Sequence, residues 1–196
     1  MKRRTYLTAT GCLAVVGLAG CIAGQATDDD EPTAFAIDTD EVPDERALHH
    51  DVTLVTSELR SEEAPLSLQV KLSNEMNEPV EFGERRATLF WDKYDEGYRL
   101  LPHDVDGEDA YEFDEDDRRW VATDVFPRTG DFQTEVVPAG EELQQELVLI
   151  AVDDELSGTP DALAFETEFW AMPEDETSGV DYEQTETWGF VLKASE

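Results

Sequence analysis

The chain has 196 residues, enough for one domain or at most two small ones, and 48 acidic against 14 basic residues give it a formal net charge of −34. Hydrophobic residues make up 40% of the chain and aromatic residues 9%, so it can form a packed core and is not a wholly disordered chain. The charge also excludes nucleic acid as a general partner, because phosphate binding needs a basic face.

Residues 1–20 have the anatomy of a signal peptide. Lys2, Arg3 and Arg4 precede a weakly apolar stretch that ends in small residues, and this stretch is too short for a helical membrane span of ~20 residues. Arg3-Arg4 followed by the letters TYL resembles the twin-arginine export signal. The resemblance implies that the chain crosses the membrane already folded.

The four residues Leu18-Ala19-Gly20-Cys21 resemble the lipobox of bacterial and archaeal lipoproteins. The resemblance implies cleavage before Cys21 and attachment of a lipid to its sulfur, which would hold the protein on the outer face of the cytoplasmic membrane. Cys12 would leave with the signal, so the processed chain would contain no disulfide. Residues 21–33, the lipidated cysteine and a small, polar and acidic stretch, are expected to form a flexible tether.

The acidic residues are distributed along the chain rather than collected in one block. They recur in nearly every ten residues from Asp28 onward, and lysine appears four times against ten arginines. An acidic tail or binding patch would concentrate the charge instead. The distributed pattern is similar to that of haloarchaeal proteins. It implies adaptation to molar salt, where a Debye length of about 3 Å screens the self-repulsion.

From residue 34 onward, the alternation of apolar and polar residues predicts short strands. The clearest strand covers residues 66–73, where four aliphatic side chains share one face. Further strands are predicted at 35–37, 52–56, 80–82, 87–94, 142–150, 163–169 and 188–192. Short strands with Gly, Pro and Asn between them, and no alternation of strands with helices, predict an all-β fold, an antiparallel β-sandwich over residues 34–196.

Two turn motifs carry a resemblance to a known class of domain. The first is Leu72-Ser73-Asn74 followed by a polar turn and Glu78-Pro79-Val80, and the second is Pro138-Ala139-Gly140-Glu141 before another strand. The pair resembles immunoglobulin-like domains of extracytoplasmic lipoproteins, over roughly residues 50–195. The resemblance implies an immunoglobulin-like β-sandwich and implies no activity.

No residue pattern predicts catalysis, and we expect a protein that is not an enzyme and has no cofactor. The chain has three histidines, His49, His50 and His103, contains no G-x-S-x-G motif, and would keep no free thiol after processing. A blue-copper site is excluded because it needs a cysteine ligand. His49 and His50 are adjacent, so in a strand they point to opposite faces, and we interpret them as a polar pair at a strand start.

The segment 104–117 is the densest acidic stretch, and it is predicted to be a loop. Oxygen ligands suit calcium, and Asp104, Asp106 and Asp109 are the candidate metal ligands. An EF-hand alignment on Gly107 fails, because it places Pro102 at the first ligand position. Two interpretations stay open: a solvated acidic excursion, or an irregular ion- or solute-binding loop.

Tryptophan side chains are the candidates for a binding platform. Trp91, Trp170 and Trp188 lie in predicted strands, which favours core packing. Trp120 follows Arg118-Arg119, and these three residues are the candidate binding surface. The sequence therefore predicts a non-catalytic surface lipoprotein that binds or assembles with another envelope protein. An ion- or solute-binding lipoprotein is the alternative, and a small hydrolase is a third hypothesis.

Overall fold

A computed structural model describes residues 33–40, 46–86, 88–91, 93–103, 110–123, 130–152, 156, 158–173 and 185–195. Within these ranges every regular element is a β-strand, which confirms the predicted all-β class. No helix in this part of the chain is long and apolar enough to cross a bilayer. The predicted export signal with Arg3 and Arg4, the lipid site Cys21 and the candidate metal ligands Asp104, Asp106 and Asp109 lie outside the described residues.

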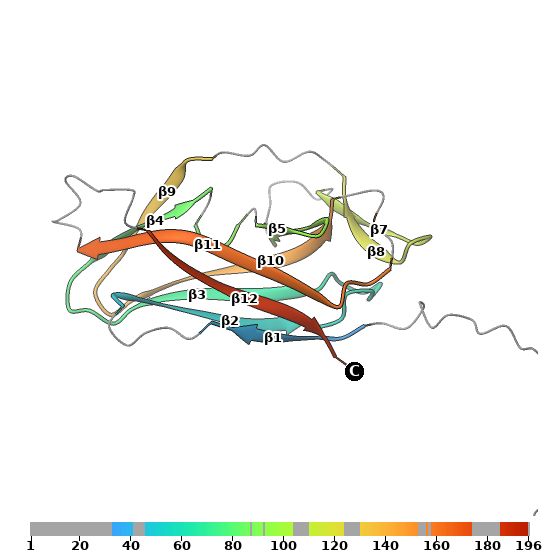
Figure 1. Cartoon of the computed structure of the whole chain (residues 1–196), viewed down its shortest axis with the longest axis horizontal. Helices are drawn as coiled ribbons and strands as arrows, with labels where there is room; N and C mark the ends of the chain where they lie inside the picture. The colour runs from blue at the N-terminus through green and yellow to red at the C-terminus, as the bar shows by residue number, and fades with distance from the viewer. Residues whose placement is uncertain are drawn as a thin grey trace, which may run out of the picture.

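The strands form two sheets (Figure 1). The first has the order β1 (Phe35–Thr39), β12 (Glu186–Ala194), β11 (Ala162–Pro173), β4 (Val80–Arg85) and β9 (Phe132–Val137). The second has the order β2 (Leu48–Thr56), β3 (Ser67–Asn74), β10 (Glu142–Ala151), β6 (Tyr98–Pro102) and β5 (Tyr94–Asp95). A hairpin of β7 (Tyr111–Asp114) and β8 (Arg119–Ala122) joins the second sheet through one parallel contact between β8 and β10, while the other strand pairs are antiparallel.

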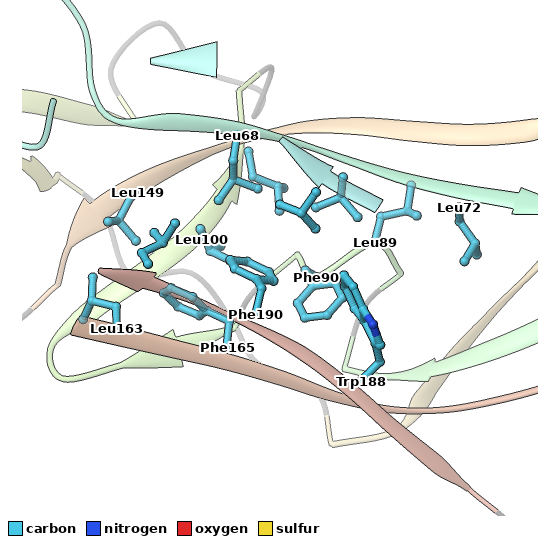
Figure 2. Packing of buried hydrophobic residues seen from close by; sticks show 14 of the residues in the cluster. Leu68, Leu72, Leu89, Phe90, Leu100, Leu149, Leu163, Phe165, Trp188 and Phe190 are labelled. Carbon is cyan, nitrogen blue, oxygen red and sulfur yellow. The ribbon is translucent and has the colours of Figure 1, made fainter. Parts of the chain in front are cut away.

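One hydrophobic core takes side chains from both sheets (Figure 2). Alternate residues of β3 point into it, and Leu68, Val70 and Leu72 are fully buried there, as the period-two pattern of 66–73 predicts. The opposing sheet contributes large aromatic residues, among them Phe165 and Trp188. Burying each such side chain contributes roughly 1.5–3 kcal/mol, so this core is the main source of stability.

A second, smaller cluster lies on the outer face of β10. Val148 and Ile150 are fully buried although they point away from the main core, because the β7–β8 hairpin covers them with Trp120 and Tyr111. This cover explains why the end of β10 reads as an unbroken apolar run rather than an alternating one. The hairpin also corrects the prediction of a loop over 104–117, since residues 111–114 form a strand.

The predicted strand at 87–94 is wrong over most of its length. Residues 88–91 form a turn, and Leu89 and Phe90 have φ angles of +57° and +63°. Both side chains are buried although they are consecutive, because the connection between β4 and β5 bends inward and inserts them between the sheets (Figure 2). Apolar residues close together in the sequence predict a strand here, but Leu89 and Phe90 instead fill space in the core between the two sheets.

The short hairpin β5–β6 has a two-residue turn with positive φ angles. Its two turn residues, Glu96 and Gly97, have φ angles of +43° and +84°, which is the sign that a two-residue turn between twisted antiparallel strands requires. Glycine tolerates this conformation without steric cost. The turn fixes where Tyr94 and Tyr98 stand, and both residues line pockets described below.

Candidate functional site

A cavity of about 320 Å³, here called the arginine pocket, lies where the β7–β8 turn meets β6. Its polar lining comes from segments far apart in the sequence, namely Arg60, Tyr98, Asp116, Asp117, Arg118 and Arg119. Three guanidinium groups therefore share one cavity with two carboxylates. This is a local excess of positive charge in a chain whose net charge is −34.

The turn between β7 and β8 brings the two adjacent arginines to this cavity. Asp114 Oδ1 accepts hydrogen bonds from the backbone N–H groups of Asp116 and Asp117, at 2.9 and 3.2 Å, which is the local bonding that makes aspartate a turn residue. Arg118 then takes a left-handed φ of +50°. This conformation ends the turn and starts β8 at Arg119.

Arg119 is the most deeply placed of the three arginines, with 7% of its surface exposed. Its Nη1 donates to the carbonyl oxygen of Leu156 at 2.8 Å, and its Nη2 donates to Asp117 Oδ2 at 2.8 Å. Its buried Nε has no hydrogen-bond partner in the described ranges. Arg119 is thus held firmly in place and keeps one donor unused.

Arg118 and Tyr98 complete the polar wall. Arg118 is half-buried, its Nη1 lies 3.4 Å from Glu62 Oε1, and its Nε has no partner among the residues described. Burial raises the pKa of Tyr98, and the nearby Arg119 and Arg60 only partly oppose this effect. Tyr98 therefore stays a neutral phenol that can donate a hydrogen bond. Such a cavity suits an anion, because guanidinium groups bind carboxylates through paired charge-assisted hydrogen bonds.

The predicted binding surface Arg118, Arg119 and Trp120 is divided by the structure. Alternation along β8 sends Trp120 to the other face, where its indole N–H donates to Ser61 O at 2.9 Å and its ring meets Phe113 edge-on. The arginines line the pocket without it. Sequence reasoning missed Arg60 and Tyr98, and no spacing between them and Arg118 could have indicated that they meet.

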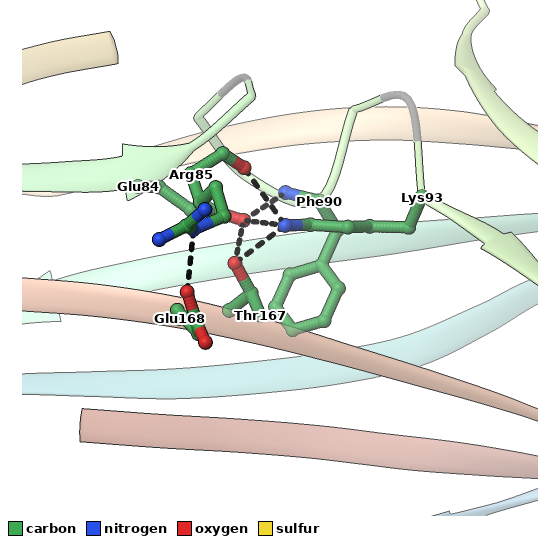
Figure 3. A network of polar contacts seen from close by, with 6 residues as sticks. All are labelled: Glu84, Arg85, Phe90, Lys93, Thr167 and Glu168. Carbon is green, nitrogen blue, oxygen red and sulfur yellow. Dashed lines mark hydrogen bonds and ion pairs between the residues drawn. The ribbon is translucent and has the colours of Figure 1, made fainter. Parts of the chain in front are cut away.

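A buried polar network lies on the opposite sheet, between β4, β11 and the β4–β5 connection (Figure 3). Glu84 is fully buried, and its Oε1 accepts hydrogen bonds from Thr167 Oγ1 at 2.7 Å and Phe90 N at 3.1 Å. Lys93 Nζ lies 3.6 Å from the same oxygen and donates to Thr167 Oγ1 at 2.7 Å and Arg85 O at 2.9 Å. Burial raises the pKa of Glu84, and Lys93 and the hydrogen bonds only partly oppose this effect.

The contact between Lys93 and Thr167 has the form of a base beside a nucleophile. A nucleophile has to meet its substrate, however, and Thr167 is 1% exposed and does not line either pocket. What the network does is structural. It fastens the β4–β5 connection to β11, because Lys93 and Phe90 of the connection both bind groups that β4 and β11 hold in place.

The two adjacent histidines point to opposite faces of β2, as the sequence predicts. His50 is 6% exposed and stacks on Trp188 at a ring-centroid distance of 4.8 Å, whereas His49 is partly exposed and lies 3.9 Å from Glu75. Burial lowers the pKa of His50 to about 3, with Arg46 and His49 adding to the effect. The two rings do not share an ion-binding site.

In the described ranges no three His, Cys, Asp or Glu side chains are placed to hold a metal ion, and the calcium hypothesis for Asp104, Asp106 and Asp109 stays a prediction. No protein-family model matches the chain, and no curated protein or solved structure shows detectable similarity to it.

Proposed function

We propose that this chain is an exported, lipid-anchored binding module, held on the outer face of the cytoplasmic membrane through Cys21, which takes a carboxylate side chain of an acidic partner protein into the arginine pocket. One observation carries the proposal. Arg60, Arg118 and Arg119 share one cavity in a chain that has 14 basic residues. A molecule so poor in cations gains nothing for solubility by grouping them, whereas recognition of an anion requires it.

The binding domain is of the immunoglobulin-like type. The strand pairs support this assignment: β3 lies beside β10 in one sheet, and β4, β11 and β12 are consecutive neighbours in the other. These are the B–E, C–F and F–G neighbours of the immunoglobulin class. The hairpin β7–β8 and the edge strand β9 are additions to that pattern, and the arginine pocket is built on the first of them.

The pocket is tested with a fluorescent hexaglutamate peptide, whose binding is followed by anisotropy in 0.5 M and 2 M KCl. Arg118→Gln removes a half-buried guanidinium, so we expect Kd to rise about tenfold or more, the effect of losing one charge-assisted hydrogen bond. Lys193→Gln is the matched control. It removes the same charge from β12, where Lys193 forms an exposed ion pair with Asp38 of β1, and Kd should stay at the wild-type value.

Two results would overturn the proposed pocket: hexaglutamate that does not bind the wild type, or equal weakening by Arg118→Gln and Lys193→Gln. Equal weakening would mean that the peptide responds to net charge alone. The screening length is about 3 Å at 1 M salt, so binding that survives 2 M KCl also requires direct contact between the peptide and the pocket.

The anchor is tested separately, in membranes of the native host. Cys21→Ser removes the sulfur to which the lipid would be attached, so we expect the protein to be released or to keep its signal. Arg3-Arg4→Lys-Lys should block export if the twin-arginine route is used. A Cys21→Ser protein that stays membrane-bound at the processed size would contradict the lipid anchor.

A further inference from the structure

A second basic cavity, here called the β4–β5 pocket, has a volume of about 300 Å³ and lies where β4 and β11 of the first sheet meet β5 of the second. Its polar lining is Arg85, Arg86, Lys93, Tyr94, Glu166 and Glu168. The first four residues belong to the end of β4, to the connection and to β5, and the two glutamates belong to β11. The binding activity proposed above does not use this pocket.

Arg86 is the cation that remains available in this pocket. Lys93 Nζ is bound by Glu84, Thr167 and the carbonyl of Arg85, and the Arg85 guanidinium forms an ion pair with Glu168 (Figure 3). The Arg86 side chain is half-buried and makes no hydrogen bond or ion pair with any residue in the described ranges. A guanidinium in that state is a binding group for an anion.

Two large aromatic side chains are exposed on the same connection. Trp91 is 43% exposed and Tyr94 is 45% exposed, against full burial of most other apolar residues of this size. Trp91 stands in the turn, two positions before Lys93, and Tyr94 lines the pocket. Exposed aromatic faces offer a large contact area at a low entropic cost, which is why tryptophan and tyrosine concentrate at binding surfaces.

The connection that carries these groups is strained and firmly fixed. Arg86, Leu89 and Phe90 have φ angles of +79°, +57° and +63°, a conformation that costs non-glycine residues free energy and persists only where the surroundings impose it. The buried network holds Phe90 and Lys93, and Asp95 Oδ2 accepts a 2.7 Å hydrogen bond from Ala164 N of β11. The exposed aromatic side chains therefore stand on a rigid base, as binding groups need to.

The mixture of charges indicates the class of ligand. An acidic peptide would meet Arg86 but would be repelled by the exposed carboxylate of Glu166. A sugar acid presents one carboxylate for Arg86, hydroxyl groups that donate to Glu166, and an apolar ring face that stacks on an aromatic side chain. We propose that the β4–β5 pocket binds a uronic acid unit of an acidic polysaccharide, with Arg86 holding its carboxylate and Tyr94 contacting its ring.

The test uses glucuronate as the probe and saturation-transfer NMR with isothermal titration as readouts on the full exported domain. Wild-type protein should bind glucuronate more tightly than glucose, which lacks the carboxylate, and more tightly than acetate, which lacks the ring. Gln at position 86 meets the same backbone strain as Arg, so Arg86→Gln should leave the fold unchanged. It removes the guanidinium group and should therefore weaken glucuronate binding about tenfold or more. Tyr94→Ala removes the exposed ring that lines the pocket and should weaken glucuronate binding while leaving acetate binding unchanged.

Arg118→Gln is the matched control, since it removes a guanidinium from the arginine pocket and should leave glucuronate binding at the wild-type level. Conversely, Arg86→Gln should leave hexaglutamate binding unchanged. Each of the two proposed sites can therefore be contradicted without affecting the other. The uronic acid proposal is overturned if glucuronate does not bind, if it binds no better than acetate, if Arg86→Gln and Tyr94→Ala bind it normally, or if hexaglutamate displaces it.

Discussion

Glu84 and Lys93 form the most buried ion pair in the described residues, and an ion pair of this kind is costly to break. Lys93→Met leaves a carboxylate without its cation, and Glu84→Leu leaves an ammonium group without its anion. Each change is expected to lower the free energy of unfolding by about 3–5 kcal/mol, and the double variant by less than the sum, because no unpaired charge remains. Urea unfolding in 2 M KCl measures this coupling.

An exposed ion pair supplies the control for these variants of the buried pair. Lys193 Nζ lies 2.6 Å from Asp38 Oδ2, and more than half of each side chain is exposed. Lys193→Met is therefore expected to change the free energy of unfolding by less than about 1 kcal/mol. If Lys93→Met costs no more than Lys193→Met, the buried network does not fasten the β4–β5 connection.

His50 makes stability depend on pH. Its pKa is about 3 in the folded protein, against an ordinary value of 6.5, so at a pH between these values the unfolded chain binds a proton that the folded chain does not. Stability is therefore lost as pH falls below 6.5. By pH 5 the loss from this residue is about 2 kcal/mol. His50→Gln should reduce the difference in unfolding free energy between pH 7 and pH 5 by that amount.

His49→Gln is the control for the pH measurement, because His49 lies on the opposite face of β2 and is partly exposed. Its pH profile should follow that of the wild type. A His50→Gln profile that also follows the wild type would mean that the buried ring is not the source of the acid sensitivity.

At the scale of elements, the β7–β8 hairpin converts an outer face of β10 into interior. Trp120 covers the fully buried Leu101, Val148 and Ile150, so Trp120→Ala is expected to lower the free energy of unfolding by at least about 2 kcal/mol. Trp91→Ala removes an exposed ring and should change it by no more than about 0.5 kcal/mol. Urea unfolding of both variants compares them, and equal costs would contradict the different placement of the two rings.

The strands differ in whether they could be predicted from the sequence. β3, β11 and β12 were predictable, because each has a buried face against the main core and alternates accordingly. β10 was predictable because Leu143, Leu147 and Leu149 share the face toward that core, although its end is buried on both faces. β9 was missed because four of its six residues are exposed, which leaves no alternation to detect. The sequence predicts a strand at 87–94 because apolar residues recur there, whereas the structure buries Leu89 and Phe90 from a turn.

At the scale of the whole molecule, the net charge of −34 is expected to govern how stability responds to salt. The proposed cleavage before Cys21 would take away three basic residues and leave 48 acidic and 11 basic ones, so the chain would become still more acidic. Self-repulsion of this size opposes folding unless salt screens it. The melting midpoint, followed by circular dichroism, is expected to rise from dilute buffer to several molar KCl. A flat or falling midpoint would remove the argument for adaptation to salt.

The sequence by itself determined the all-β class, the alternating strands that face the core, the opposite faces of His49 and His50, and the acidity of the surface. These properties are local or compositional, since the side chains of one strand alternate whatever the strand packs against. Tertiary structure alone decided which side chains meet. Glu84 binds Thr167 across 83 positions, Arg60 joins Arg118 and Tyr98 in one pocket, and Trp120 packs on β10 while Trp91 is exposed. These contacts depend on how the sheets and the hairpin pack, and no short stretch of the sequence predicts that packing.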